Sequence, residues 1–251
     1  MSFKGKIAIV TGAGSESGIG TETVIALAEK GCNVVAADLN FEGAEKLAAQ
    51  VRALGVEAIA APLDVTNEKS VQEMVDNTIG KFGRIDILVN NAGITQPVKT
   101  VDTTLADFMR IINVNLVGTF LCSKAAVKYM IAQKYGRIVN MSSVSAKRGG
   151  GVYGGSHYSA AKAGILGFSK ALAREVVESG ITVNSVCPGL VATKMRKGVT
   201  DEQERAMWEP IPMKRPATTR EIAEAIAFLT SDAAAYITGE EIDINGGTHM
   251  D

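Results

Sequence analysis

The sequence has few of the residues that build metal sites, disulfide frameworks or nucleic-acid surfaces. It contains two histidines and three cysteines, and the cysteines Cys32, Cys122 and Cys187 are widely separated. That number and spacing fit neither paired disulfides nor a metal-ligand motif, so we expect three buried thiols and no metal. The 26 lysines and arginines nearly balance the 27 aspartates and glutamates without forming a basic run. This balance disfavours nucleic acid or an anionic membrane as a partner.

Long apolar runs are also absent. The N-terminal MSFKGKIAIVTG reaches a strand-like apolar run within six residues, which leaves no room for a signal peptide. No apolar segment approaches the ~18 residues that a membrane helix needs. We therefore expect a cytoplasmic protein that acts on a small molecule. With 251 residues, 46% of them hydrophobic, the chain is long enough for one domain, 1–251, around one sizeable core.

Short runs rich in Val, Ile and Ala alternate with longer stretches of helical period. The runs are nearly continuous in apolar residues, which indicates strands buried on both faces of a parallel sheet. With right-handed crossovers, the sequence predicts an α/β fold: a single-domain Rossmann-type, doubly wound parallel sheet of about seven strands with helices on both faces. The predicted strands are 6–11, 33–38, 57–64, 85–90, 137–142, 182–187 and 240–245.

A glycine-spaced segment follows the first predicted strand. KIAIVT runs into TGAGSESGIG (11–20), and TETVIALAEKG then opens a helix. This order is typical of a phosphate-binding loop, because glycines let the backbone approach a pyrophosphate and the helix N-terminus offers unpaired N–H groups. The residues expected to contact a dinucleotide here are Gly12, Ser17, Gly18, Ile19 and Gly20.

Asp38 ends the second predicted strand, twenty residues after Gly18. An acidic residue at this distance is typical of a carboxylate that binds the adenosine ribose, although it could instead cap the following helix. A carboxylate accepts a bond from a ribose 2′-hydroxyl and repels a 2′-phosphate, and neither Ser17 nor Leu39 supplies a compensating cation. The sequence therefore predicts NAD in preference to NADP.

Four motifs, in this order along the chain, resemble those of the short-chain dehydrogenase/reductase (SDR) family. They are the glycine loop, NNAG (90–93), the serine stretch NMSSVS with YSAAK (158–162), and PGLVAT (188–193). The resemblance covers essentially the whole chain. One departure is the glycine loop, which has two residues more than the TGxxxGxG pattern of the family.

In YSAAK, Tyr158 and Lys162 are four residues apart and so share a helix face. Two charges ~4 Å apart at an effective dielectric of ~20 interact by about 4 kcal/mol, or roughly three pKa units. An ammonium at that distance would lower the pKa of the phenol into the working range of an acid or base. By themselves such residues are more often a solvated surface pair, and the neighbouring serine stretch and dinucleotide loop favour the catalytic interpretation.

The resemblance implies a catalytic set of four. Tyr158 would be the general acid/base, Lys162 would lower its pKa and bind the nicotinamide ribose, Ser143 would hold the substrate oxygen, and Asn115 would support a relay water. The family spacing from serine to tyrosine is shorter than the fifteen residues here, and Ser145 would restore it. We prefer Ser143, because NMSS continues a strand as the family motif does. The residues expected to line the substrate pocket are Ser143, Ser145, Tyr153 and Tyr158.

By the same resemblance, the segment of about 190–216 would be a lid over the substrate, and the chain would assemble as a homotetramer. Lys147 and Arg148 follow the catalytic serine, and with the lid cations they suggest a substrate that carries an acidic group. A solvated loop face is the simpler explanation of these cations. The remaining residues expected to contact the cofactor are Asp64, Val65, Asn91, Ala92, Gly93, Pro188, Gly189 and Thr193, besides Tyr158 and Lys162.

Three functions fit these features. The favoured one is an NAD-dependent dehydrogenase that transfers a hydride between NAD(H) and a secondary alcohol or ketone of the sugar, polyol or hydroxy acid class. The alternative is a 3-oxoacyl-[acyl-carrier-protein] reductase; the resemblance implies NADPH and a basic pair for carrier docking in these enzymes, and here the pair is Lys134 with Ser179. The third is a catalytically silent NAD-binding scaffold or sensor.

Overall fold

A seven-stranded parallel sheet forms the centre of the molecule in the computed structural model, which describes residues 2–151, 154–193 and 201–250. The strand order is β3-β2-β1-β4-β5-β6-β9, so the chain winds outward from β1 in both directions. This confirms the predicted fold class and the seven predicted strands. Their bounds are β1 Ile7–Thr11, β2 Asn33–Asp38, β3 Ala58–Pro62, β4 Ile87–Asn90, β5 Gly136–Met141, β6 Ile181–Pro188 and β9 Glu241–Ile244.

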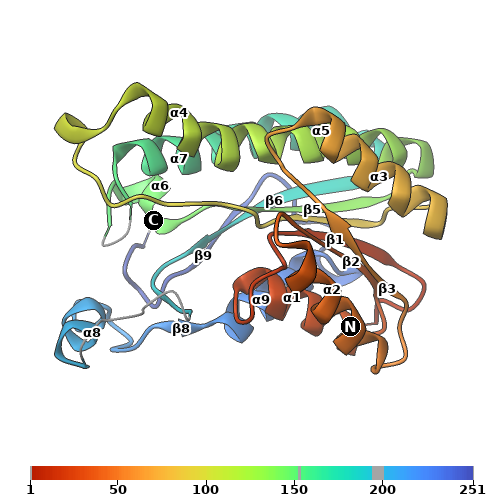
Figure 1. Ribbon diagram of the computed structural model, residues 1–251, viewed down its shortest axis with the longest axis horizontal. Coiled ribbons are helices and arrows are strands. Elements are labelled where there is room, and N and C mark those ends of the chain that lie inside the picture. Colours follow the sequence, from red (N-terminus) through yellow and green to blue (C-terminus); the bar gives the residue numbers. More distant parts are fainter. Residues whose placement is uncertain (1, 152–153, 194–200, 251) are drawn as a thin grey trace.

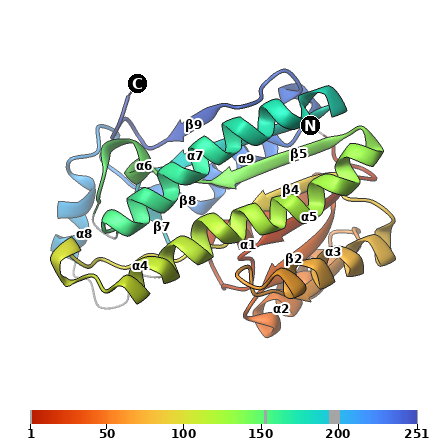
Figure 2. The same cartoon turned by 90° about the horizontal axis from the view of Figure 1, so that it is seen from above.

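Helices cover both faces of the sheet (Figure 1). One layer contains α1, α2 and α9, and the other contains α3, α4, α5 and α7, whose long α4–α5 and α7 helices run side by side (Figure 2). The helix bounds are α1 Ile19–Glu29, α2 Phe41–Arg52, α3 Glu68–Phe82, α4 Leu105–Ile112, α5 Gly118–Gln133, α6 Val144–Arg148, α7 Ser156–Val176, α8 Asp201–Trp208 and α9 Thr219–Leu229. The short elements are the 3-10 turns Thr100–Asp102, Val177–Ser179 and Asp232–Ala234, the π turn Asn113–Val117, and the strand pair β7 Val191–Ala192 and β8 Ala217–Thr218.

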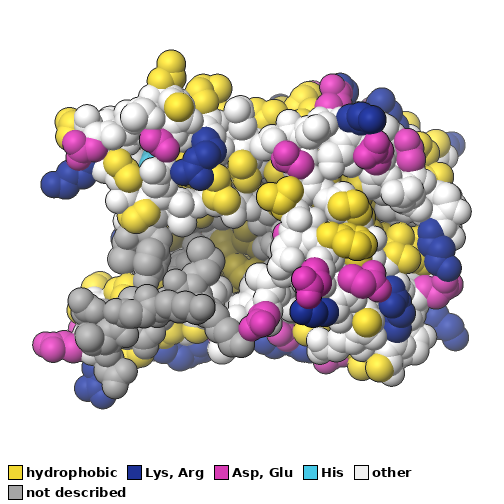
Figure 3. All heavy atoms as spheres, in the orientation of Figure 1, with side chains coloured by type: hydrophobic (Ala, Val, Ile, Leu, Met, Phe, Trp, Pro, Cys, Tyr) yellow, Lys and Arg dark blue, Asp and Glu magenta, His cyan; other side chains and the backbone are white. Residues whose placement is uncertain are grey.

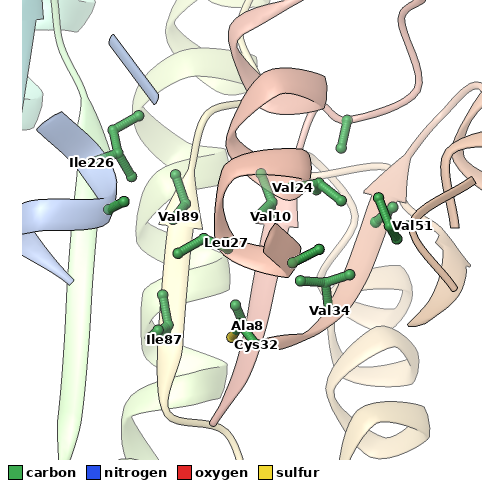
Figure 4. Packing of buried hydrophobic residues seen from close by; sticks show 14 of the residues in the cluster. Ala8, Val10, Val24, Leu27, Cys32, Val34, Val51, Ile87, Val89 and Ile226 are labelled. Carbon is green, nitrogen blue, oxygen red and sulfur yellow. The ribbon is translucent and has the colours of Figure 1, made fainter. Parts of the chain in front are cut away.

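Each helix layer closes its own apolar core against the sheet. On the side of α1, α2 and α9, Val10 and Val34 of the strands meet Leu27 and Ile226 of the helices (Figure 4). The opposite core joins the other faces of the same strands to α3, α5 and α7. Because successive strand residues point to opposite faces, a continuous apolar run supplies both cores, which is why these strands lack alternation. The three cysteines are buried and unpaired, as predicted.

The stretch Leu105–Gln133 forms one continuous helix in which a π turn joins α4 to α5. By length and composition, its 29 residues with a window hydropathy of 1.4 could cross a membrane, so the prediction that no segment approaches that length is wrong. Two asparagines in NVNLVG interrupt the apolar pattern of this stretch. In the structure one side of this helix packs on β4, β5 and α7, as a core helix does.

Candidate active site

Five strands of the sheet end on the edge where the predicted motifs meet. Parallel strands bring their carboxyl ends to one edge, which is where open α/β sheets bind ligands. The strand-end residues there are Thr11, Asp38, Asn90, Met141 and Pro188. The four motifs therefore converge because each follows one of these strands.

The glycine loop is packed against NNAG. Asn91 Nδ2 donates to the carbonyl oxygens of Thr11 and Gly12 at 2.9 and 3.0 Å, and the Ala92 N–H donates to the Thr11 hydroxyl. A Cβ atom on Gly12 would lie 2.8 Å from Ala92 Cα, and the φ of Gly12 is +70°, so only glycine suits this position. Asn91 thus supports the loop from behind.

The N-terminus of α1 fits the pyrophosphate of a dinucleotide. Gly18 is the N-cap, and no side chain in the described part of the chain caps this helix end. Its first N–H groups are therefore open to an anion, and the helix dipole favours negative charge there. A Cβ atom on Gly18 would collide with the Ser15 hydroxyl, so this position admits no larger side chain. Ser17 and Ile19 flank Gly18 as the sequence predicts.

Asp38 lies beside the loop, but its carboxylate already has partners. Oδ2 accepts the Gly14 N–H at 2.7 Å, and Oδ1 accepts the Asn40 N–H at 2.8 Å. Asn40, rather than Asp38, caps the following helix, since its side-chain oxygen accepts the Gly43 N–H. The alternative role of Asp38 as a helix cap is therefore wrong.

The four predicted catalytic residues come together at the ends of β4 and β5. Ser143 is the N-cap of α6, and its hydroxyl hydrogen-bonds the phenol of Tyr158 on the first turns of α7. Lys162 Nζ lies 5.6 Å from the centre of the Tyr158 ring and donates to the Met141 carbonyl at 2.7 Å. This contact favours Ser143 over Ser145, whose N–H instead donates to the Ser143 hydroxyl.

Asn115 is presented by the π turn between α4 and α5. Its Nδ2 donates to the carbonyl oxygens of Ile94 and Ile111, both at 2.9 Å, while its Oδ1 is buried without a hydrogen-bond partner among the residues that the structure describes. A Cβ atom on Gly93 would lie 2.6 Å from this Oδ1 and 3.4 Å from Lys162 Nζ. A buried unpaired acceptor close to an ammonium fits the predicted role of holding a relay water.

Burial shifts the pKa values of both Tyr158 and Lys162. It raises the pKa of Tyr158 above its ordinary value, and the Ser143 hydrogen bond offsets this only in part. Burial also lowers the pKa of Lys162 to about 8. The expectation that Lys162 lowers the pKa of Tyr158 is wrong for this arrangement, because the ammonium is directed to the Met141 carbonyl and desolvation of the phenol dominates.

The remaining predicted contacts lie around this centre. Gly189 follows β6, and its N–H donates to the Ile244 carbonyl at 3.0 Å. Thr193 is half-buried at the end of the described segment that also contains Pro188. Val65 packs on Gly118, while the Asp64 carboxylate accepts the N–H and hydroxyl of Thr66.

Two predictions about the substrate side concern residues that the structure does not describe. Tyr153 and lid residues 194–200 lie outside the described residues. The described part of the segment predicted as a lid, 190–216, includes α8, and β7 in this segment pairs with β8, which directly follows it.

Lys147 does not face the substrate as an attracting cation. Its ammonium pairs with Asp243 at 2.9 Å and Glu241 at 3.6 Å on β9, and its side chain is only 8% exposed. Carboxylates 94 and 96 residues away neutralise it, so the hypothesis of an anion-attracting role is wrong for Lys147. On the face in Figure 3, basic and acidic side chains are interspersed rather than gathered by sign.

Residues that the sequence did not predict hold these groups in place. The Ser142 hydroxyl donates to the Lys162 carbonyl at 2.9 Å and so ties α7 to the end of β5. Asn40 and Gly43 enclose Gly14. An asparagine directly before the helical pattern FEGAEKL is a cap signal, and it could have identified Asn40.

Comparison with known proteins agrees with this geometry. A family profile described as Enoyl-(Acyl carrier protein) reductase matches residues 12–249. A short-chain type dehydrogenase/reductase, y4mP, from Sinorhizobium fredii (strain NBRC 101917 / NGR234) is 43% identical over 249 residues, 98% of each chain. The chain therefore belongs to the short-chain dehydrogenase/reductase family and is an oxidoreductase that acts on a small molecule.

Other relatives carry a more particular name. The 3-oxoacyl-[acyl-carrier-protein] reductase FabG of Escherichia coli (strain K12) is 41% identical over 250 residues, 100% of each chain. The 3-oxoacyl-[acyl-carrier-protein] reductase of Synechocystis sp. (strain ATCC 27184 / PCC 6803 / Kazusa) is 42% identical over 250 residues, 98% of this chain and 97% of its own.

The predicted preference for NAD over NADP is corrected by these relatives. They are the reductases for which the family resemblance implies NADPH. The prediction depended on the negative charge of Asp38 and on the lack of a neighbouring cation, and in the structure both carboxylate oxygens accept backbone N–H groups. The positive ends of those dipoles offset part of its charge, so the carboxylate repels a 2′-phosphate less than an unpaired one would.

Proposed function

We propose that this protein is a 3-oxoacyl-[acyl-carrier-protein] reductase, which reduces the 3-oxo group of an acyl thioester to a 3-hydroxyl group with NADPH. The observation that carries the proposal is similarity along the whole chain to reductases of that name, 41% identity over 100% of both chains for the Escherichia coli enzyme. When bound, the cofactor supplies the hydride, and the residues of the chain supply the proton and the orientation.

The protonation of Tyr158 supports the reductive direction. Reduction of a ketone needs a proton donor, whereas oxidation of an alcohol needs a base. Because burial raises the pKa of the Tyr158 phenol, the phenol is protonated at neutral pH. The Ser143 hydroxyl lies against the same phenol, so the two O–H groups can donate together to one carbonyl oxygen.

Lys162 and Asn115 lie where they can help to return a proton to Tyr158 after the transfer. The Lys162 Nζ lies 5.6 Å from the centre of the Tyr158 ring. The unpaired Asn115 Oδ1 accepts a bond from a water between it and Lys162, through which a proton returns to the phenol. Retention of this set in one place argues against a silent scaffold.

The carrier-docking surface has one cation of the expected pair. Lys134 is exposed at the C-cap of α5, and Gly180, next to Ser179, lies against its backbone. The two positions therefore adjoin in space, with a single positive charge between them. We expect a thioester on coenzyme A to be reduced as well as one on the carrier protein.

The test is reduction of a 3-oxobutanoyl thioester, on carrier protein and on coenzyme A, with NADPH or NADH. Turnover with NADPH is expected, and Tyr158→Phe should lower kcat by about 10² to 10⁴. Tyr129→Phe is the matched control, since its hydroxyl lies on α5 near Asp76, outside the site. Faster oxidation of secondary alcohols with NAD than reduction of either thioester would refute the proposal.

We also propose a cytoplasmic homotetramer. The outer side of the α4–α5 helix exposes large apolar side chains, including Leu105, Phe120 and Ile131. The Phe120 ring meets Phe168 of α7 edge-on at 6.1 Å, so the two helices present one apolar surface. Such a surface on a layer already packed against the sheet suits contact with another subunit.

A further inference from the structure

Tyr158 lies on the first turn of α7, an end of the helix that has no side-chain cap. The N-cap is Gly155, and no side chain in the described part of the chain donates to or accepts from this end as a cap. Gly154 precedes it, and glycines restrain the backbone less than other residues do. The first N–H groups of a helix lack intrahelical partners, so this turn depends on contacts from elsewhere in the fold.

His157 is the buried side chain of this first turn. Its imidazole is fully buried, whereas Ser156 and Ala160 are exposed and Tyr158 is half-buried. The imidazole stacks on the Phe108 ring of α4, with the ring centres 6.4 Å apart and the ring planes at 27°. His157 therefore anchors the start of α7 to α4, which lies beside it (Figure 2).

Both ring nitrogens of His157 are buried without a hydrogen-bond partner among the described residues. Such groups are uncommon in folded proteins, and they lower the free energy of unfolding because the lost contact with water is not replaced. A leucine, which is similar in size, would pack against Phe108 without this cost. Packing alone therefore does not account for a histidine at this position, which points to a role for its polarity.

The Val98 carbonyl lies beside the imidazole. A Cβ atom on Gly155 would lie 2.6 Å from the Val98 oxygen and 2.8 Å from His157 Nδ1, so an acceptor and a ring nitrogen border the same point. Val98 belongs to the loop between β4 and α4. The first part of this loop is attached to the catalytic set, because the Ile94 carbonyl accepts the Asn115 amide at 2.9 Å.

The far end of the loop is attached to α7. The Thr100 and Ser156 hydroxyls form a hydrogen bond with their oxygens 2.9 Å apart. Val98 lies along the chain between this attachment and the one at Ile94. A hydrogen bond from the imidazole to the Val98 carbonyl would hold the middle of the loop against the turn that carries Tyr158.

We propose that His157 is a positioning residue of the active site: its ring N–H donates to the Val98 carbonyl in the substrate complex and so fixes Tyr158 against the loop 94–100. This rests on the role of Tyr158 in the proposed function. Hydrogen bonds in an active site are often longer in the free enzyme and shorten when substrate binds. Without this bond the phenol is displaced and transfers its proton more slowly, whereas the substrate still binds, so kcat falls more than KM rises.

Three variants of the whole protein test this inference. His157→Leu keeps most of the volume and removes both nitrogens, whereas His157→Asn keeps an N–H donor near the position of Nδ1. Ser169→Ala is the matched control, because it also removes a buried polar group from α7. The Ser169 hydroxyl accepts the Asn140 amide at 2.8 Å and donates to the Ile165 carbonyl at 2.7 Å, outside the catalytic set.

Steady-state kinetics and urea unfolding are measured on each variant. We expect His157→Leu to lower kcat about tenfold or more, with KM changed less than about threefold and the urea midpoint unchanged or higher. His157→Asn should keep kcat within about threefold of the wild type, because the donor is retained. Ser169→Ala should show the opposite pattern, a lower urea midpoint with unchanged kcat, because it leaves the buried Asn140 amide without this partner.

An equal fall of kcat in His157→Leu and His157→Asn would overturn the inference, because the N–H would then not be the cause. Unchanged kcat in His157→Leu, or a urea midpoint that falls together with kcat, would overturn it as well. The assay uses the thioester or, if the wild type does not reduce it, the secondary alcohol that the wild type oxidises fastest, since both reactions need an aligned Tyr158. Failure of the proposed function therefore shows in the wild type, and failure of this inference shows only in the variants.

Discussion

The buried Lys162 gives a prediction of how the stability of the protein depends on pH. Its side chain is buried on α7, with 3% of the residue exposed, and burial lowers its pKa from 10.5 to about 8. At one pKa unit per 1.36 kcal/mol, keeping this lysine charged costs the folded state about 3 kcal/mol. The cost is complete below pH 8 and disappears as the pH rises from the folded pKa toward the unfolded one.

The variant Lys162→Met removes this titration. The free energy of unfolding of the wild type, minus that of the variant, should therefore rise by about 2 kcal/mol between pH 7 and pH 9.5. Urea unfolding followed by circular dichroism at both pH values, at one fixed protein concentration, measures this difference. The methionine also leaves the Met141 carbonyl without its partner, which shifts the difference equally at both pH values.

Leu166→Met is the control, because it changes packing one turn further along the same helix without removing a titrating group. Its difference from the wild type should be the same at pH 7 and pH 9.5. A wild-type minus Lys162→Met difference that stays flat, or falls, with rising pH would refute the reasoning, because the lysine would then not be desolvated in the folded state.

Three further changes test other parts of the structure. Gly93→Ala places a methyl group 2.6 Å from Asn115 Oδ1, and should lower kcat at least tenfold with Kd for the cofactor also raised; normal kinetics would show that this acceptor is not used. Lys147→Met removes the ammonium that pairs with Asp243, whereas Glu241 keeps Lys170 at 2.6 Å, and the free energy of unfolding should fall by about 2 kcal/mol, less than for a fully buried pair. Unchanged urea unfolding would contradict that. Phe120→Glu should reduce the particle mass seen by light scattering, and an unchanged mass would exclude this part of α5 as a subunit contact.

The strands were predictable because their signal is local. Runs such as 6–11 and 33–38 carry apolar residues on both faces, and no neighbouring segment is needed to recognise them. The positions of the site residues followed, since parallel strands bring their ends to one edge. The single helix Leu105–Gln133 was not predicted, because the buried Asn115 interrupts its apolar pattern at a π turn that only the three-dimensional structure reveals.

The sequence by itself determined the order of strands and helices, the glycine loop before α1, and the Tyr158–Lys162 pair one helical turn apart. Tertiary structure decided what the charges do. The Asp38 carboxylate accepts a hydrogen bond from a loop residue 24 positions away, and the Lys147 ammonium pairs with carboxylates about 95 positions away. The pKa values of Tyr158 and Lys162 follow from burial. Desolvation and hydrogen bonding depend on neighbours that come from distant parts of the chain, and those neighbours exist only in the folded protein.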